Sequence, residues 1–595
     1  MCGIAGVIST SSEKNCMASA LEAMQSHLLH RGPDGHETYH CPSQQAALTH
    51  TRLAIIDLSQ MAAQPMSDNS KQYTITFNGE IYNYQVLRKK LISLGYKFNS
   101  NSDTEVILNL YAEYGSACVN YLRGMFAFLI WDTHSKTAFA ARDPLGIKPF
   151  YFWHNQQSFA FASELKALIA SGFSQQQLDS NGIFSYLKTG SVSEPNTLIN
   201  DITLLDAGHY LQWENGHIKK HKYWDIDFNH RKTITRTNAI KKTRKALDDS
   251  IKAHLVSDVP IGLFLSGGID STALLALASK NTTRQINTYS IAFEEAAWNE
   301  GDIARKVANH FGSNHTELVM TKERATQLYK DYYLAIDQPS IDGFNTFCVA
   351  KLAHDHGEKV VLSGLGGDEL FAGYKSFELL PKMVRLSHLS KPFAPIIRLK
   401  SKLLNPILIT KFRRIFDFLS QPGSLIAAHQ SLRGVFSNSE AATLAANICK
   451  SKITNKNVLD EHNTNNIANA ISKIELKTYT RNQLLRDSDV MSMHWGLELR
   501  VPLIDSTLID DLADIPAEIR LSQGKKLLID SVPEIPDWVH NRPKQGFRFP
   551  FDLWFKQQWQ QSEINPKPDK WIKLTPWYRQ WSLVMLTLWI KRHAK

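Results

Sequence analysis

Two patterns of hydrophobic and polar residues follow each other along the chain. Up to about residue 205, short runs rich in β-branched and aromatic residues alternate with turns, which predicts β-strands. Helical spacing of apolar residues interrupts these strands near residues 18–30 and 104–114. Antiparallel strands with a few helices are typical of a layered α+β domain. The predicted strands are residues 3–8, 73–77, 125–131, 138–141, 151–153 and 159–161.

A polar, turn-rich passage at about residues 214–236 predicts the junction to a second domain. Beyond it, the order of strand, loop and helix is typical of a parallel sheet. From about residue 375 to the end, the pattern is mostly helical and rich in tryptophan, which fits core packing better than a sugar-facing surface. The predicted strands of this second part are residues 261–265, 286–293 and 360–362, and a helix is predicted at residues 272–280.

Composition places the chain among ordinary globular proteins. Its 595 residues, of which 43% are hydrophobic and 21% charged, predict two or three domains. The net charge of +10 comes from scattered basic residues, so we expect no nucleic-acid partner. The apolar stretch 581–590 is shorter than the roughly 20 residues of a membrane-spanning helix, so no membrane span is expected. Six cysteines without a CxxC pair favour a reducing compartment, the cytoplasm.

The second residue of the chain, Cys2, is the strongest chemical feature of the first part. If Met1 is removed, Cys2 carries both a nucleophilic sulfur and a free α-amine. A free thiol has a pKa of about 8.5 and needs a base, and an α-amine that titrates near pH 8 supplies one within the same residue. The alternative is that Cys2 is only a small apolar residue at the start of a strand.

Two glycine-rich loops are the strongest chemical feature of the second part. In residues 264–272 a strand runs through Ser-Gly-Gly into a helix, and backbone N–H groups at such a turn bind phosphate. A similar loop lies at residues 360–369. Loops that follow parallel strands meet at one edge of the sheet, where Asp270 and Asp368 are placed to share a magnesium-bound triphosphate.

The N-terminal Cys-Gly-Ile and the Ser-Gly-Gly-Ile-Asp-Ser loop together resemble the glutamine-hydrolysing asparagine synthetases, over nearly the whole chain. The resemblance implies an α+β four-layer N-terminal-nucleophile glutaminase domain at residues 1–215. It further implies an α/β parallel-sheet ATP-pyrophosphatase-type domain with a helical C-terminal part at residues 232–595, joined to the first by an internal ammonia tunnel. The resemblance is also compatible with a homodimer. Supporting motifs lie at residues 30–35, 51–57, 78–83, 102–105 and 141–146.

The resemblance also implies the chemistry of the first domain. The Cys2 sulfur would attack the side-chain amide of glutamine, form a thioester and expel ammonia. Hydrogen-bond donors would stabilise the oxyanion, a guanidinium would bind the α-carboxylate of glutamine, and a carboxylate would bind its α-ammonium. The matching residues are Cys2 as nucleophile, Asn78 and Gly79 as oxyanion donors, and Arg52, Glu80 and Asp103 as glutamine-binding residues.

In the second domain, ATP would activate a carboxylate as an acyl-adenylate with release of pyrophosphate, and ammonia would then attack the acyl carbon. Mg²⁺ would bind Asp270 and Asp368. The residues implied in ATP binding are Leu265, Ser266, Gly267, Gly268, Asp270, Ser271, Ile291, Ser363 and Gly364.

Two late motifs also match the family. Residues 487–502 imply that Glu498 acts as a catalytic acid–base group and that Arg500 binds the acceptor. The alternative for this Glu-x-Arg is a solvated pair on a helix. Residues 542–547 imply that Lys544 contacts the phosphates and the adenylate.

The second loop departs from the family pattern, because Leu365 stands where these enzymes carry an acidic residue. The stretch 337–346 differs as well. A leucine neither binds an α-ammonium nor accepts a proton. Aspartate, converted to asparagine, is the predicted acceptor, and another carboxylate, such as a uronic-acid sugar or a peptide side chain, is the alternative. A third interpretation is an N-terminal-nucleophile hydrolase whose second domain only binds nucleotide.

Overall fold

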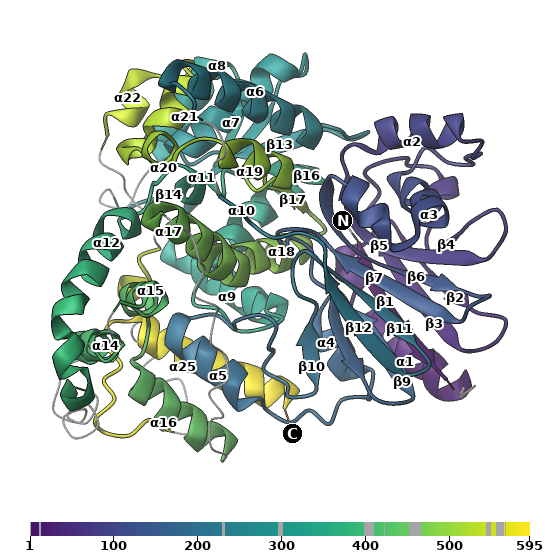
Figure 1. The fold of residues 1–595 in the computed structure, drawn as a ribbon, viewed down its shortest axis with the longest axis horizontal. Helices are drawn as coiled ribbons and strands as arrows, with labels where there is room; N and C mark the ends of the chain where they lie inside the picture. Colours follow the sequence, from purple (N-terminus) through teal and green to yellow (C-terminus); the bar gives the residue numbers. More distant parts are fainter. Residues whose placement is uncertain are drawn as a thin grey trace.

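The computed structural model gives the arrangement of most of the chain (Figure 1). The predicted phosphate-contacting residue Lys544 lies outside the residues that the structure describes. The described residues are all except 1, 11–13, 229–232, 296–300, 398–409, 422, 451–465, 543–548, 555–563, 566 and 595.

Two antiparallel sheets stack face to face in the N-terminal part, which lies on the right in Figure 1. Apolar side chains from both sheets, including Ile4, Leu129 and Trp131, fill the space between them. The first sheet has the order β10 (Ile202–Leu204), β8 (Tyr151–His154), β9 (Ser158–Ala162), β1 (Gly3–Ser9), β3 (Ala46–Arg52) and β2 (Gly35–His40). The second has the order β12 (His217–Lys222), β11 (His209–Glu214), β7 (Thr137–Arg142), β6 (Gly124–Asp132), β5 (Tyr73–Ile81) and β4 (Met66–Ser67).

Helices cover the outer faces of both sheets and complete four layers. The first sheet is covered by α1 (Lys14–Ser26) and α4 (Leu165–Ala170). On the second sheet, α3 (Asp103–Tyr114) packs against β5, with α2 (Tyr84–Ser93) beside it. The side chain of Ser102 accepts a hydrogen bond from the Thr104 N–H and caps α3, which puts Asp103 in the first turn. The predicted four-layer α+β architecture is confirmed.

The six strands predicted in this part are present as β1, β5, β6, β7, β8 and β9, and six further strands were missed: β2, β3, β4, β10, β11 and β12. Strand β6 is buried on nearly its whole length because a sheet lies on one face and a helix layer on the other, so its sequence is a continuous apolar run. The predicted junction at residues 214–236 does not consist of turns alone, because β12 lies within it. Its side chains are mostly exposed at a sheet edge, so its sequence carries no apolar alternation. The domain boundaries at residues 215 and 232 stay a prediction.

A five-stranded parallel sheet forms the centre of the C-terminal part, and helices cover it on both faces (Figure 1). The predicted strands are confirmed as β13, β14 and β16. The strand order is β15 (Asn314–Met320), β14 (Asn287–Phe293), β13 (Ile261–Phe264), β16 (Val360–Leu362) and β17 (Glu498–Arg500). The helices around it are α6 (Arg236–His254), α7 (Ile269–Asn281), α8 (Gly301–Phe311), α9 (Lys322–Ala335), α10 (Phe344–Asp355), α11 (Gly367–Leu370), α18 (Arg486–Met493), α19 (Ser506–Ala513), α20 (Ala517–Arg520), α21 (Lys526–Ser531) and α22 (Asp537–His540).

The interpretation of Glu498 and Arg500 as a solvated helical pair is wrong. Both residues lie on β17, which pairs with β16, and both are fully buried. The sequence did not predict this strand, because a three-residue segment with two charged residues shows no apolar alternation. They are tolerated in the interior because they pair with each other and with further polar groups.

A mostly helical layer ends the chain, as predicted. The C-terminal helix α25 packs beside α5, where the Tyr186 hydroxyl donates to the Ser582 carbonyl at 2.8 Å. Trp554, Trp581 and Trp589 are buried, which confirms core packing for these three tryptophans. Among the described residues, every helix is too short or too polar to span a membrane. The remaining helices are α5 (Ser180–Thr189), α12 (Ser376–Ser387), α14 (Thr410–Leu419), α15 (Leu425–Arg433), α16 (Asn438–Cys449), α17 (Ile467–Glu475), α23 (Phe551–Trp554) and α25 (Tyr578–His593), with a π-helical segment at Leu476–Leu485 between α17 and α18.

Candidate active sites and their interface

Cys2 lies directly before β1 and meets Asn78 of β5. The Cys2 backbone nitrogen donates to the Asn78 side-chain oxygen at 3.0 Å, and Cys2 itself is 8% exposed. The Asn78 side-chain nitrogen is buried and has no hydrogen-bond partner among the described residues. Buried donors are almost always paired, so an unpaired amide beside a cysteine is suited to an oxyanion that forms during a reaction.

Gly79 follows Asn78 where two strands approach closely. A Cβ atom at this position would lie 2.1 Å from the Met125 carbonyl oxygen, and the backbone φ is +152°. Any side chain would therefore push β5 away from β6 and displace Asn78. The predicted oxyanion residues Asn78 and Gly79 are thus placed together beside Cys2.

Two carboxylates, Glu80 and Asp103, lie close to each other near Cys2, and we call their cluster with Cys2 and Asn78 the Cys2 pocket. The Asp103 carboxylate accepts a hydrogen bond from the Ile81 N–H at 2.9 Å. Burial, together with the negative charge of Glu498, raises the pKa of Asp103 to about 6. Burial and the charges of Glu498 and Asp103 raise the pKa of Glu80 as well. The pocket therefore favours a cationic ligand group that would stabilise both carboxylates in their ionised form.

Arg52 lies at the end of β3, opposite Cys2 in the register that pairs Thr51 with Gly3. Its guanidinium donates to the backbone carbonyls of Asp57 and Ser59, the latter at 2.9 Å. The structure thus brings the six residues predicted for glutamine chemistry to one end of the N-terminal part.

The two predicted glycine loops meet at the carboxyl edge of the parallel sheet. Gly364 and Gly367 of the second loop lie so close to Asp270 that a Cβ at Gly367 would fall 2.2 Å from its carboxylate oxygen. Gly267, with a φ of +70°, turns the first loop toward the start of α7. The backbone N–H groups at a helix N-terminus are suited to an anion, and phosphate binding at this loop stays a prediction.

Lys525 joins the two loops and was missed in the sequence. Its ammonium contacts the carboxylates of both Asp270 and Asp368, the latter at 2.5 Å. Burial lowers its pKa, but the two carboxylates raise it further, to about 12, so Lys525 is charged. A sequence indication existed, because Gly524-Lys525 forms a tight turn directly before α21.

A cavity of about 1210 Å³ opens at this sheet edge. Of the predicted ATP and metal residues, Ser266, Gly267, Gly268, Asp270 and Asp368 line it. The other predicted ATP residues do not contribute to its lining and lie around the loops or in the sheet: Leu265, Ser271, Ile291, Ser363 and Gly364.

The cavity extends well beyond the phosphate loops. Leu365 lines it, together with Ile341, Asp342, Phe344 and Asn345, so the two stretches that depart from the family pattern lie at one site. Its outer wall carries cationic and aromatic side chains, among them Tyr374, Arg414, Arg433, Tyr479, Trp577 and Tyr578.

Glu498 and Arg500 do not line this cavity. The Arg500 Nε donates to the Glu498 carboxylate at 2.5 Å, and its Nη2 lies 3.6 Å from the Glu80 Oε2. The structure therefore brings the two predicted acceptor-side residues to the Cys2 pocket of the N-terminal part.

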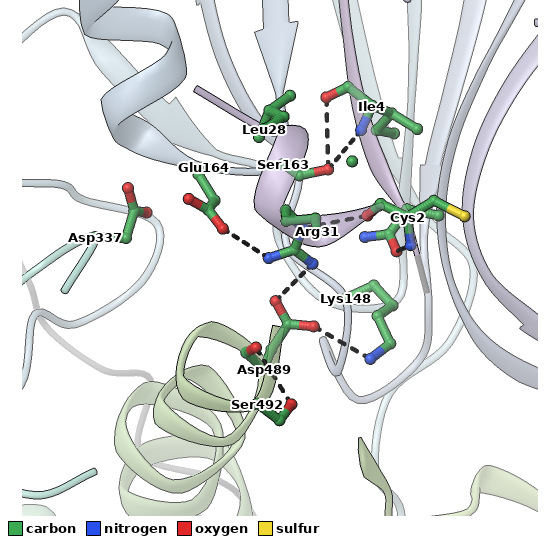
Figure 2. Close-up of polar contacts among 12 residues, drawn as sticks. Cys2, Ile4, Leu28, Arg31, Lys148, Ser163, Glu164, Asp337, Asp489 and Ser492 are labelled. Atoms are coloured by element: carbon green, nitrogen blue, oxygen red, sulfur yellow. Dashed lines mark hydrogen bonds and ion pairs between the residues drawn. The ribbon is translucent and has the colours of Figure 1, made fainter. Parts of the chain in front are cut away.

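A buried guanidinium connects the two parts (Figure 2). Arg31 donates from Nε to the Cys2 carbonyl at 3.1 Å, from Nη1 to Glu164 at 2.9 Å, and from Nη2 to Asp489 of α18 at 2.9 Å. Lys148 also contacts the Asp489 carboxylate, at 3.2 Å. No pattern in the sequence indicates these contacts, because Arg31 and Asp489 are 458 positions apart.

A four-layer part with Cys2 beside Asn78, followed by a parallel sheet with two glycine-rich loops at one edge, fits the class of glutamine-hydrolysing, ATP-dependent ligases. Residues 1–224 match the glutamine amidotransferase domain family, and residues 242–570 match the asparagine synthase family. The chain therefore belongs to the glutamine-hydrolysing asparagine synthetase family, and it is a ligase for glutamine- and ATP-dependent amidation.

Three relatives show the extent of the similarity. Asparagine synthetase (glutamine-hydrolysing) 1 of Bacillus subtilis is 32% identical over 94% of this chain and 88% of its own length. A putative asparagine synthetase of Mycobacterium bovis is 32% identical over 93% of this chain and 88% of its own length. Amidase chry2 of Gibberella zeae is 26% identical over 93% of this chain and 90% of its own length.

Replacing Arg31 tests the buried interface. We expect Arg31→Met to lower the free energy of unfolding by about 3–5 kcal/mol, because Glu164 and Asp489 would remain as buried charges that have lost a partner. The matched control is Lys359→Met, which breaks an exposed ion pair with Asp34 between the same two parts and should cost less than about 1 kcal/mol. Urea unfolding of both variants measures the two free energies of unfolding. Equal losses of stability in the two variants would show that the buried contacts of Arg31 contribute no more than an exposed ion pair.

Proposed function

We propose that this protein transfers the amide nitrogen of glutamine to a carboxylate that ATP has activated, with aspartate as the first candidate acceptor. The buried, unpaired Asn78 amide beside Cys2 is the observation that carries the proposal. Membership of the asparagine synthetase family supports the pairing of this site with ATP chemistry.

In the glutamine site, Cys2 is the nucleophile. Burial raises the pKa of its thiol, so the resting thiol is protonated and needs a base, which the α-amine supplies once Met1 is removed. The sulfur attacks the amide carbon, and the oxyanion is stabilised by Asn78 and the Gly79 N–H. Ammonia leaves with the proton taken from the thiol, and water then hydrolyses the thioester to glutamate. Arg52 binds the α-carboxylate of glutamine, and the carboxylates of Asp103 and Glu80 bind its α-ammonium.

In the second site, the backbone of Ser266–Gly268 and the ammonium of Lys525 hold the phosphates of ATP. The acceptor carboxylate attacks the α-phosphate, pyrophosphate leaves, and ammonia then displaces AMP from the acyl carbon. We propose that this ammonia crosses the interface inside the protein. Lys544, which lies outside the described residues, stays a candidate for contacts with the adenylate.

Mg²⁺ fits the residues at the two loops. Asp270 and Asp368 both contact the single ammonium of Lys525, so their oxygens converge on one point. Mg²⁺ in nucleotide sites is held by one or two carboxylates together with phosphate oxygens, and two carboxylates are what the loops offer. When bound, the ion would neutralise the charge of the leaving pyrophosphate.

Two candidate acceptor carboxylates are each favoured by a different observation. Aspartate is favoured by the names of the relatives. A larger carboxylate, such as a uronic-acid sugar or a peptide, is favoured by one observation: Leu365 lines a cavity of about 1210 Å³, larger than the roughly 300–1,000 Å³ of a typical small-molecule site. Aromatic side chains such as Trp577 in its outer wall are suited to stack against a sugar.

A cytoplasmic location and a homodimer stay predictions. The location is supported by the free thiols of Cys41, Cys118 and Cys348, all buried without a disulfide. Free thiols persist in reducing compartments. Analytical ultracentrifugation of the purified protein would test the oligomeric state.

Replacing Cys2 separates the two nitrogen sources. We expect Cys2→Ala to reduce glutamine-dependent amidation by about 10³-fold or more while ammonia-dependent amidation stays near wild type, because only the nucleophile is lost. Product formation with each nitrogen source measures this, and mass spectrometry of the active wild type should find Met1 removed. If the protein were fully active with Met1 intact, the α-amine of Cys2 could not be the base and the proposed mechanism would be wrong.

Replacing Asp270 tests the metal assignment. We expect Asp270→Asn to reduce pyrophosphate release about 100-fold or more with either nitrogen source, because one of the two carboxylates for Mg²⁺ is lost. Glutamine hydrolysis at Cys2 should persist. Asp302→Asn, at an exposed position of α8, is the matched control and should behave as wild type. Wild-type pyrophosphate release in Asp270→Asn would show the assignment to be wrong.

Exchange of labelled pyrophosphate into ATP identifies the acceptor, because adenylation is reversible and needs the correct carboxylate. Aspartate, a hexuronic acid and a peptide with a free side-chain carboxylate are compared in the presence of Mg²⁺. Exchange that depends on aspartate is the result expected for the first candidate. Exchange only with a larger acid would identify the second candidate, and none with any carboxylate would contradict the adenylation step.

A further inference from the structure

Arg500 reaches from the C-terminal part into the glutamine pocket of the N-terminal part. It lies on β17 and is fully buried, and its Nη2 lies 3.6 Å from the Glu80 Oε2. Neither of these two atoms has a hydrogen-bond partner among the described residues, and they form an ion pair at this distance. A buried pair just beyond hydrogen-bond distance can close when a ligand orders the pocket.

The other nitrogens of Arg500 are held firmly. Its Nε donates to the Glu498 carboxylate at 2.5 Å. Its Nη1 donates to the carbonyls of His254 and Val256 at 2.8 and 2.6 Å. These partners follow or belong to the end of α6 and to β17, so the C-terminal part fixes the guanidinium. Only Nη2 is left to face the neighbouring part.

Glu80 needs a cation, because carboxylates crowd around it. Asp103 and Glu498 both act on it electrostatically, and burial strengthens the repulsion. Glu498 is ionised more easily than Glu80. Although burial raises its pKa, nearby positive charges, including Arg500 and Lys148, lower it below the ordinary value. Arg500 is therefore the guanidinium that balances the acidic side of the pocket.

We propose that Arg500 is a positioning residue for glutamine binding: from the C-terminal part it holds the Glu80 carboxylate toward the α-ammonium of glutamine, and Glu498 orients its guanidinium. The inference rests on the proposed function only in taking the Cys2 pocket as the glutamine site. It replaces the acceptor role that the sequence predicted for Arg500, since Arg500 does not line the large cavity. The glutamine site is complete only when both parts are in contact.

Arg500→Gln tests this in the full chain with glutamine hydrolysis measured without ATP or acceptor. We expect the KM for glutamine to rise about 10- to 100-fold, because truncating one member of a buried charge pair leaves Glu80 misplaced. The kcat of ammonia-dependent amidation and its KM for the acceptor should stay within about twofold of wild type. An increased acceptor KM with unchanged glutamine KM would restore the acceptor role and overturn the proposal.

The pH profile gives a readout that a purely structural role would not move. Asp103 and Glu80 must be ionised to bind an α-ammonium, so kcat/KM for glutamine should fall as the pH drops through about 6, the pKa of Asp103. Losing the positive charge of Arg500 makes protonation easier, so this fall should occur at higher pH in Arg500→Gln. The charged and titratable groups around the guanidinium include Glu80, Asp103, Glu498, Lys148, Tyr82, His254, Asp505 and Arg123.

Two further variants keep the test decisive. Arg500→Lys retains the charge without the planar fork and should fall between wild type and Arg500→Gln, and it carries the test if Arg500→Gln does not fold. In a double-mutant cycle, Arg500→Lys should add little to the KM of Glu80→Gln, because the two residues act through one contact. Fully additive effects would overturn the proposal.

The matched control is Arg123→Gln. Arg123 forms another ion pair between the same two parts, with its Nε 3.0 Å from Asp505, and its guanidinium forms no hydrogen bond or ion pair with Glu80, Asp103 or Arg52 of the described residues. Its glutamine KM and pH profile should match wild type. An equal shift in Arg123→Gln would show that any break in the interface weakens glutamine binding. If Cys2→Ala still hydrolysed glutamine, the proposed function would fail instead, independently of Arg500.

Discussion

The Arg31 guanidinium donates to groups of both parts of the chain, and the placement of the two candidate sites depends on it. A buried guanidinium is stable only if its N–H groups are paired. Its partners are the Cys2 carbonyl and Glu164 on one side and Asp489 on the other. Neither part alone provides hydrogen-bond acceptors for all the N–H groups of Arg31. Cys2, the proposed nucleophile, is thereby held against α18 of the C-terminal part.

A single stretch of chain relates the two sites. Its π-helical segment, Leu476–Leu485, contributes Tyr479, Asn482 and Gln483 to the cavity. Directly after it, α18 carries Asp489 to Arg31, and β17 carries Arg500 to Glu80. π-helical turns are frequent at functional sites because they redirect side chains within a helix. Residues 476–500 therefore touch the large cavity at one end and the Cys2 pocket at the other.

Local patterns explain what the sequence predicted. Strands such as β6 and the meeting of the two glycine loops follow from apolar runs and from the rule that parallel strands end at one sheet edge. Cys2 and Asn78 were placed together through the family resemblance. The contacts of Arg31 and Arg500 were not predictable, because they join residues hundreds of positions apart. Buried charges of this kind look like surface residues in a sequence, and only the folded interface supplies their partners.

An isotope experiment tests most directly whether the two sites act as one. Glutamine labelled with ¹⁵N in its amide is supplied together with excess unlabelled ammonium, ATP and the carboxylate that supports pyrophosphate exchange. We expect the product amide to carry mainly ¹⁵N, because ammonia released at Cys2 reaches the acyl-adenylate before it mixes with the solution. A product whose ¹⁵N content equals that of the bulk ammonium pool would contradict it.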